Sequence, residues 1–262
     1  MNKAPVVLSL ISKAGGVGKT VTAINIGYEI FLRGFKVGII DLDDNHSAEE
    51  FVGLDPEPNP DLTTVALLED FQGDYNFRPI LGTQRLMLYQ GHNALEDANK
   101  RLVSQRNREF ILKKMLTKHP PDLDVIIFDN QGGFNLLVEN SIVASSHILI
   151  PVKIGAKILS VPELIEQIYQ VIYDLDLDPA PEILGILPNL HNHKSVKHKQ
   201  VLDSLLESID GIGHHRYSAI SFWQHLENST LVAKALKQYR PSDPIAKVFS
   251  SIVDDLLESA KL

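Results

Sequence analysis

The chain has 262 residues, of which 44% are hydrophobic and 22% are charged, a balance typical of globular proteins that bury a full core. Its formal net charge at pH 7 is -8, so contact with nucleic acid would depend on a local basic patch and not on the overall field. The sequence contains no cysteine, which excludes disulfides, thiol catalysis, thiolate zinc sites and iron–sulfur clusters.

Short apolar runs of strand length alternate along the chain with amphipathic stretches of helix length. In chain order, we expect a strand at 6–11, a helix at 20–32, strands at 37–40 and 86–89, a helix at 106–118, strands at 124–128 and 147–152, a helix at 160–173, a strand at 183–187, and helices at 195–206 and 244–259. The proline-rich acidic segment 55–61 reads as a surface loop. This alternation predicts an α/β fold with a mostly parallel twisted sheet and helices on both faces.

The length fits one domain over residues 1–262. No apolar run approaches the roughly 20 residues that a membrane span needs. The expected C-terminal helix has an apolar stripe, but its polar face carries more acidic than basic residues, unlike helices that lie on membranes. We therefore expect a cytoplasmic protein whose last helix packs on the domain and makes no membrane contact.

Residues 13–20 carry the glycine-rich sequence KAGGVGKT between the first expected strand and the first expected helix. Glycines allow backbone N–H groups to approach phosphate oxygens, and a helix N-terminus adds a favourable partial charge. In such a loop Lys19 reaches the terminal phosphates and the Thr20 hydroxyl ligates Mg²⁺. The sequence thus predicts a P-loop NTPase that binds ATP through Gly15, Gly16, Val17, Gly18, Lys19 and Thr20.

Acidic residues follow two further expected strands. Asp41 and Asp43 come after the strand at 37–40, and Asp129 comes after the strand at 124–128. The carboxyl ends of parallel strands share one edge of the sheet with the phosphate loop. One carboxylate could therefore support Mg²⁺ while another orients the attacking water.

At these residues the chain resembles the ParA/MinD family of deviant-Walker ATPases along nearly its whole length. The resemblance rests on GGVGKT at 15–20, VGIIDLD at 37–43, IIFD at 126–129, GILPN at 185–189 and YRPSDPIA at 239–246. It implies a homodimer that encloses two ATP molecules, hydrolyses them and separates. It also assigns roles: Lys19 and Asp43 in catalysis, Thr20, Asp129 and Asp43 at Mg²⁺, and Asn189 at the adenine.

The chain departs from the family pattern at three places. The family's signature lysine is Ala14 here, the Pro-Gln after the second motif is Asp44-Asn45, and the Pro-Pro after the Walker B aspartate is replaced by residues 130–133, NQGG. The missing lysine would normally reach the partner's phosphates. A later lysine takes that role in the McdA branch, which positions carboxysomes, so we expect Lys157, and next Lys153, to make this trans contact.

The resemblance further implies non-specific binding of the ATP dimer to nucleoid DNA, through lysines that meet phosphates. Residues 191–200 supply Lys194, Lys197 and Lys199, and residues 100–118 form a second basic stretch. The expected activity is ATP hydrolysis that positions a carboxysome with an McdB-like adaptor. Two alternatives stay open: partition of a plasmid or chromosome with a ParB-like adaptor, and an ATP-dependent metabolic ligase of the same superfamily.

Overall fold

The computed structural model describes residues 4–69, 71–154, 161–190, 195–210, 213–221 and 224–262. The strands are β1 (Val6–Leu10), β2 (Val37–Leu42), β3 (Arg78–Ile80), β4 (Thr83–Tyr89), β5 (Val125–Asn130), β6 (His147–Lys153) and β7 (Glu182–Asn189). The helices are α1 (Lys19–Leu32), α2 (Ser47–Val52), α3 (Thr64–Leu67), α4 (Leu95–Leu102), α5 (Ile111–Lys118), α6 (Leu136–Ala144), α7 (Val161–Asp174), α8 (Val196–Asp210), α9 (Gln224–Leu231), α10 (Leu236–Tyr239) and α11 (Pro244–Ala260). Two single 3₁₀ turns, η1 (Pro60–Leu62) and η2 (Arg108–Phe110), complete the described elements.

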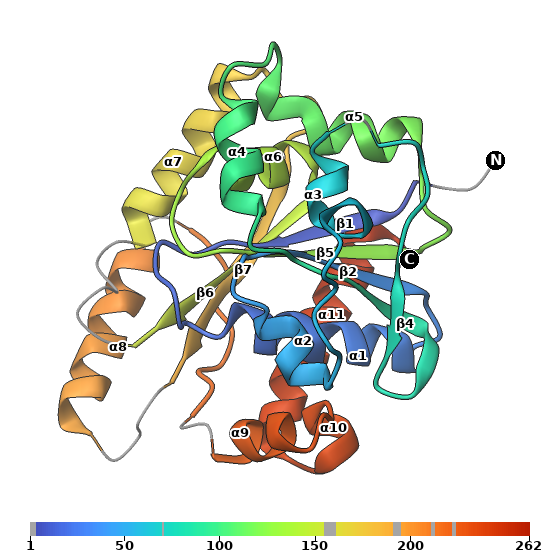
Figure 1. Ribbon diagram of the computed structural model, residues 1–262. Helices are drawn as coiled ribbons and strands as arrows, with labels where there is room; N and C mark the ends of the chain where they lie inside the picture. The colour runs from blue at the N-terminus through green and yellow to red at the C-terminus, as the bar shows by residue number, and fades with distance from the viewer. Residues whose placement is uncertain (1–3, 70, 155–160, 191–194, 211–212, 222–223) are drawn as a thin grey trace.

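The strands form one seven-stranded sheet in the order β3-β4-β2-β5-β1-β6-β7 (Figure 1). Every neighbouring pair is parallel except β3 and β4, which are antiparallel. The prediction of a mostly parallel sheet is therefore confirmed. Because the central strands run in one direction, the loops that leave β1, β2, β5, β6 and β7 all emerge at one edge.

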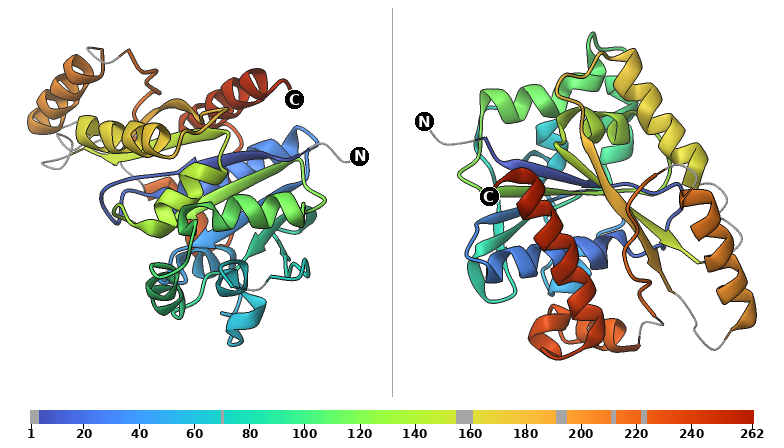
Figure 2. Two further views of the ribbon diagram at one scale, coloured as in Figure 1. Left: turned by 90° about the horizontal axis from the view of Figure 1, so that it is seen from above. Right: turned by 180° about the vertical axis from the view of Figure 1, so that it is seen from behind.

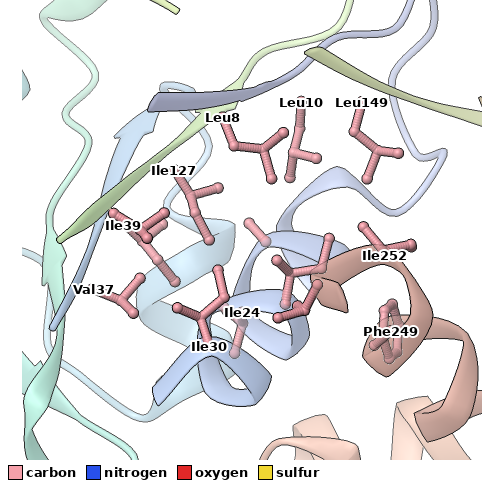
Figure 3. Close-up of a cluster of buried hydrophobic side chains, with 14 of the residues drawn as sticks. Leu8, Leu10, Ile24, Ile30, Val37, Ile39, Ile127, Leu149, Phe249 and Ile252 are labelled. Carbon is pink, nitrogen blue, oxygen red and sulfur yellow. The ribbon is translucent and has the colours of Figure 1, made fainter. Parts of the chain in front are cut away.

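Helices cover both faces of the sheet, as the sequence predicts. Alternate residues of each central strand face opposite layers: Leu8, Ile39 and Ile127 pack with α1 and α11 (Figure 3). Their neighbours Val7 and Ile40 pack instead under α3, α4 and α5. Figure 2 shows the resulting helix–sheet–helix layers from two further sides. The strands are buried on both faces, which explains their near-continuous apolar sequences.

The last helix packs on the domain, as expected, and it lies against the first helix. Its buried residues, including Phe249 and Ile252, join the core cluster on the α1 face. Arg33 at the end of α1 donates to Asp254 at 2.6 Å and to the Ser250 carbonyl at 3.2 Å. No helix within the described ranges is long and apolar enough to cross a membrane.

Several elements differ from the sequence-based expectation. The helix expected at 106–118 starts as η2 and becomes α5 only at Ile111, because Asn107 adopts a left-handed backbone (φ 53°) before it. Helix α6 was not predicted, since it is buried on nearly all sides and lacks an amphipathic period. Its start is nevertheless marked by Asn135, whose side chain accepts from the Leu137 and Val138 amides. The three-residue edge strand β3 and the short helices α2, α3, α4, α9 and α10 were not predicted either.

Candidate nucleotide-binding site

The glycine-rich loop joins β1 to α1 at the carboxyl edge of the sheet. Gly16 and Gly18 have left-handed backbones (φ 65° and 89°), a conformation that glycine adopts readily. A Cβ atom built on Gly15 or Gly16 would meet no atom within 4 Å, so the crest of the loop faces open space. No side chain caps the N-terminus of α1. Its first amides are therefore available to an anion.

Lys19 is the first residue of α1 and is almost fully buried. Its Nζ donates to Ser12 Oγ at 3.1 Å, and Ser12 Oγ donates in turn to the Ala14 carbonyl at 2.9 Å. Burial lowers the pKa of Lys19, whereas Asp129 and Asp43 raise it. The ammonium is thus held on the inner side of the loop, near two carboxylates.

Asp41 and Asp129 are register partners on the adjacent strands β2 and β5. Both strands extend further than the sequence suggests, so these residues lie inside the strand ends and not after them; in this detail the prediction was wrong. Asp41 lies two residues after Ile39, and Asp129 lies two residues after Ile127. Because side chains two apart on a strand share a face, both aspartates lie on the face that α1 covers.

The burial of these carboxyl groups is costly. Burial raises the pKa of Asp129 to about 7, although the Thr20 hydroxyl and the charge of Lys19 act in the opposite direction. Burial and the charge of Asp129 also raise the pKa of Asp41 well above its usual range. The oxygens of Asp129 and Asp41 Oδ2 are buried, and apart from the Thr20 hydroxyl beside Asp129 no described residue donates a hydrogen bond to them. Unpaired buried carboxylates beside Thr20 and Lys19 fit a site that a cation completes.

Asp43 directly follows β2 and is half-buried. Its Oδ1 accepts from the Asn45 side-chain amide at 2.6 Å and from the Asn45 backbone at 3.2 Å, while its own amide donates to Asp41 Oδ1 at 2.9 Å. Burial raises the pKa of Asp43, and the Asn45 amide and Lys19 lower it. Asn45, one of the departures from the family pattern, therefore fixes the orientation of the Asp43 carboxylate.

The segment that replaces the family's Pro-Pro packs directly on the phosphate loop. Asn130 Nδ2 donates to the Leu10 carbonyl at 3.1 Å, and the Gly133 amide donates to the Ser12 carbonyl at 3.1 Å. A Cβ atom on Gly132 would lie 2.5 Å from the Gly15 nitrogen. Only glycine fits at this contact, a role that the sequence analysis did not assign.

Asn189 ends β7 and is buried. Its Nδ2 donates to the Val17 carbonyl at 2.9 Å, so it holds the back of the phosphate loop, and its Oδ1 is buried without a partner among the described residues. The predicted contact with adenine remains a prediction. Glu49 of α2 was missed by the sequence analysis: it is buried, and its charge raises the pKa of both Asp41 and Asp129.

The candidate trans lysines have different surroundings. Lys13, which precedes the position of the missing family lysine, pairs with Glu163 of α7 at 2.5 Å. Lys153 is exposed at the end of β6, in register with Asn189 at the nucleotide edge. Lys157 lies outside the described residues. Among the DNA-binding candidates, Lys197 and Lys199 are exposed on α8, and Lys194 also lies outside the described residues.

A family model described as AAA domain matches residues 6–178, more than half of the chain. The chromosome partitioning protein ParA of Myxococcus xanthus is 27% identical over 207 residues, which cover 76% of this chain and 70% of that protein. The chain belongs to the ParA/MinD family of ATPases. A further family member, the maintenance of carboxysome distribution protein A of Synechococcus elongatus, is 27% identical over 180 residues, 68% of this chain and 69% of its own.

Solved structures of the ParA/MinD fold agree with this assignment. The McdA–ATP complex from Cyanothece superposes with a TM-score of 0.85 and 21% identity, covering 97% of each chain. Cobyrinic acid a,c-diamide synthase from Mycobacterium smegmatis, with a bound ATP analogue and magnesium, gives a TM-score of 0.77 and 22% identity over 98% of this chain and 96% of its own. These likenesses establish the shared P-loop NTPase fold.

Proposed function

We propose that this protein is a Mg²⁺-dependent ParA-type ATPase whose ATP-bound dimer binds DNA without sequence preference and positions or partitions a cargo. The observation that carries the proposal is the meeting of an open phosphate loop with the buried carboxylates Asp41 and Asp129 and the oriented carboxylate Asp43. The chain acts as one ATPase domain over residues 1–262 in this proposal.

The loop amides and Lys19 would hold the phosphates of ATP, and Thr20 with Asp129 would hold Mg²⁺. Bound Mg²⁺ supplies charge neutralisation for phosphoryl transfer. Among the described residues no three histidine or acidic side chains converge as a ready-made metal site. This agrees with Mg²⁺ sites that combine one or two protein groups with phosphate oxygens and water.

Asp43 would orient the attacking water. Its Oδ1 is fixed by Asn45, and its position after β2 places it at the same edge as the loop. Positioning and electrostatics supply most of the catalysis in phosphoryl transfer, so a carboxylate held in one orientation is suited to this task.

Dimerisation needs a cation in place of the family's missing loop lysine, because two nucleotide polyanions must approach each other. Lys13 is engaged by Glu163, which supports the assignment of this role to Lys157, with Lys153 as the second candidate. For DNA, we propose the exposed end of α8 with Lys197 and Lys199, continued by Lys194. Figures 1 and 2 place α8 at the periphery of the molecule, where a duplex can reach it.

We propose a carboxysome as the cargo, with an McdB-like adaptor that stimulates hydrolysis on the nucleoid. The McdA likeness and the carboxysome-distribution relative support this choice. Partition with a ParB-like adaptor is the second candidate and is supported by the ParA relative. A metabolic ligase of the same fold is the third, and the diamide synthase shares that fold.

Phosphate release from ATP tests the proposed chemistry. We expect slow hydrolysis that requires Mg²⁺ and is absent in Lys19→Ala, with Lys36→Ala, at an exposed lysine away from the loop, as the control that keeps it. Stimulation by duplex DNA or an adaptor supports the positioning function. Turnover that appears only with an amide donor and a carboxylate substrate would instead support the ligase.

A further inference from the structure

A groove lies between α3, α4 and α5, on the face of the sheet opposite α1. Its volume is about 730 Å³, within the size range of ligand-binding sites. It contains no residue of the phosphate loop and none of the carboxylates described above. Its occupant is therefore a matter separate from the proposed ATPase function.

The rim of the groove is basic. Among the residues that the structure describes, four cations line it, Arg101, Arg106, Lys114 and Lys118, together with one carboxylate, that of Glu69. Arg101 pairs with Glu69 at 2.5 Å, whereas the other three cations have no ion pair among the described residues. The rim is therefore a positively charged patch on a chain whose net charge is -8, and such a patch attracts an acidic partner.

The interior of the groove is apolar. Phe71 and Ile111 are half-buried on its walls, and Leu102 and Met115 form its base. The ring of Phe71 meets the edge of His119 at 5.8 Å, and Tyr75 donates to the His119 carbonyl at 2.6 Å, so this wall is well supported. Ile111 and Met115 are four residues apart on α5 and face the groove together, as do Ala98 and Leu102 on α4.

An apolar base beneath an unpaired basic rim fits a particular kind of ligand. Apolar side chains would enter the groove while carboxylates meet the rim, as in recognition of amphipathic helices and of acidic motifs. Nucleic acid fits less well, because phosphates gain nothing from the apolar base. We propose that this groove docks an acidic, amphipathic segment of a partner protein.

The methionines provide a site-specific test. The chain has three, and of the two that the structure describes, Met115 lines the groove and Met87 lies on β4. The probe is a short synthetic peptide with leucines at helical spacing and glutamates elsewhere, titrated into protein with ¹³C-labelled methionine methyl groups. The Met115 signal is assigned with Met115→Leu. We expect it to shift saturably with this peptide while the signal of Met87, on β4, stays constant.

Charge-reversed variants decide whether the rim is responsible. Lys114→Glu/Lys118→Glu should weaken peptide binding by at least about tenfold. The matched control, Lys197→Glu/Lys199→Glu on α8, makes the same change in charge and should bind as the wild type does. A circular dichroism spectrum and a melting temperature like those of the wild type show that either variant is folded.

Three outcomes would overturn the proposal: no shift at Met115, equal binding of a peptide with lysine in place of glutamate, or duplex DNA that shifts Met115 and displaces the acidic peptide. Because the readout is peptide binding, it does not depend on ATP hydrolysis. Failure of the ATPase proposal would leave this test unaffected.

Discussion

Gly132 lies so close to Gly15 that a Cβ atom on Gly132 would sit 2.5 Å from the Gly15 nitrogen. The loop after β5 therefore supports the phosphate loop from behind. Gly132→Ala should displace the loop and weaken ATP binding by about 1–3 kcal/mol, the usual cost of overpacking a tight contact. Isothermal titration with Mg-ATP measures this, and the neighbouring Gln131→Ala is the control. Equal affinity of Gly132→Ala and wild type would contradict the packing argument.

Asp129 is a buried carboxyl group whose pKa is raised to about 7 by burial. In the absence of Mg-ATP, Asp129→Asn should therefore raise the free energy of unfolding by about 1–3 kcal/mol, because it removes an unpaired buried charge. The same variant should lose the thermal stabilisation that Mg-ATP gives. Melting curves with and without Mg-ATP test both effects, with the exposed Asp122→Asn as control. A wild-type response of Asp129→Asn to Mg-ATP would argue against the Mg²⁺ assignment.

Asn45 fixes Asp43 through a 2.6 Å hydrogen bond from its side-chain amide. Asn45→Ala removes that bond and leaves the Asp43 carboxylate held only by the longer, 3.2 Å hydrogen bond from the backbone amide of residue 45. We expect kcat to fall by about tenfold while KM for ATP stays within about twofold, because positioning affects the reaction step and not the binding step. Steady-state phosphate release gives both constants, and Asn45→Gln is the conservative variant, which keeps a side-chain amide donor. A rise in KM with unchanged kcat would assign Asn45 to binding.

His147 is buried in β6 between Ser146 and Ser259, at 2.9 Å and 3.0 Å from its ring nitrogens. Burial lowers the pKa of His147, and Glu182 raises it. The unfolded chain thus takes up a proton near pH 6.5 that the folded chain resists, so stability decreases as pH falls below about 6.5. Between pH 6.5 and 5, the free energy of unfolding from denaturant titrations should fall more steeply with decreasing pH in wild type than in His147→Gln. The difference in slope should reach up to about 1.4 kcal/mol per pH unit. If the free energy of unfolding changed equally with pH in both proteins, His147 would make no contribution to the pH dependence of stability.

The sequence predicted the parallel sheet, the phosphate loop and the strand-end acids, because hydrophobic runs and glycine spacing are local signals. It did not predict that Asn45 holds Asp43, that Gly132 supports Gly15, or that Glu49 lies near Asp41. The contact of Gly132 with Gly15 depends on which strands are neighbours, because β5 lies beside β1 only in the folded sheet. The hydrogen bond from Asn45 to Asp43 joins residues two apart, but residue type alone does not show that the turn brings them together. Helix α6 was missed for a similar reason, since a helix buried on nearly all sides has no polar face to mark its period.

The central claim is an ATP-dependent dimer that binds DNA. Asp43→Ala should bind ATP and fail to hydrolyse it, so the dimer accumulates. Size-exclusion chromatography with light scattering in saturating Mg-ATP, followed by retention of duplex DNA of unrelated sequences, measures both properties. The companion variant Asp43→Ala/Lys157→Ala should stay monomeric while still binding nucleotide, and Asp43→Ala/Lys153→Ala tests the second candidate in the same way. We predict a dimer of Asp43→Ala that retains every duplex; a monomer that ignores DNA in saturating Mg-ATP would contradict the account.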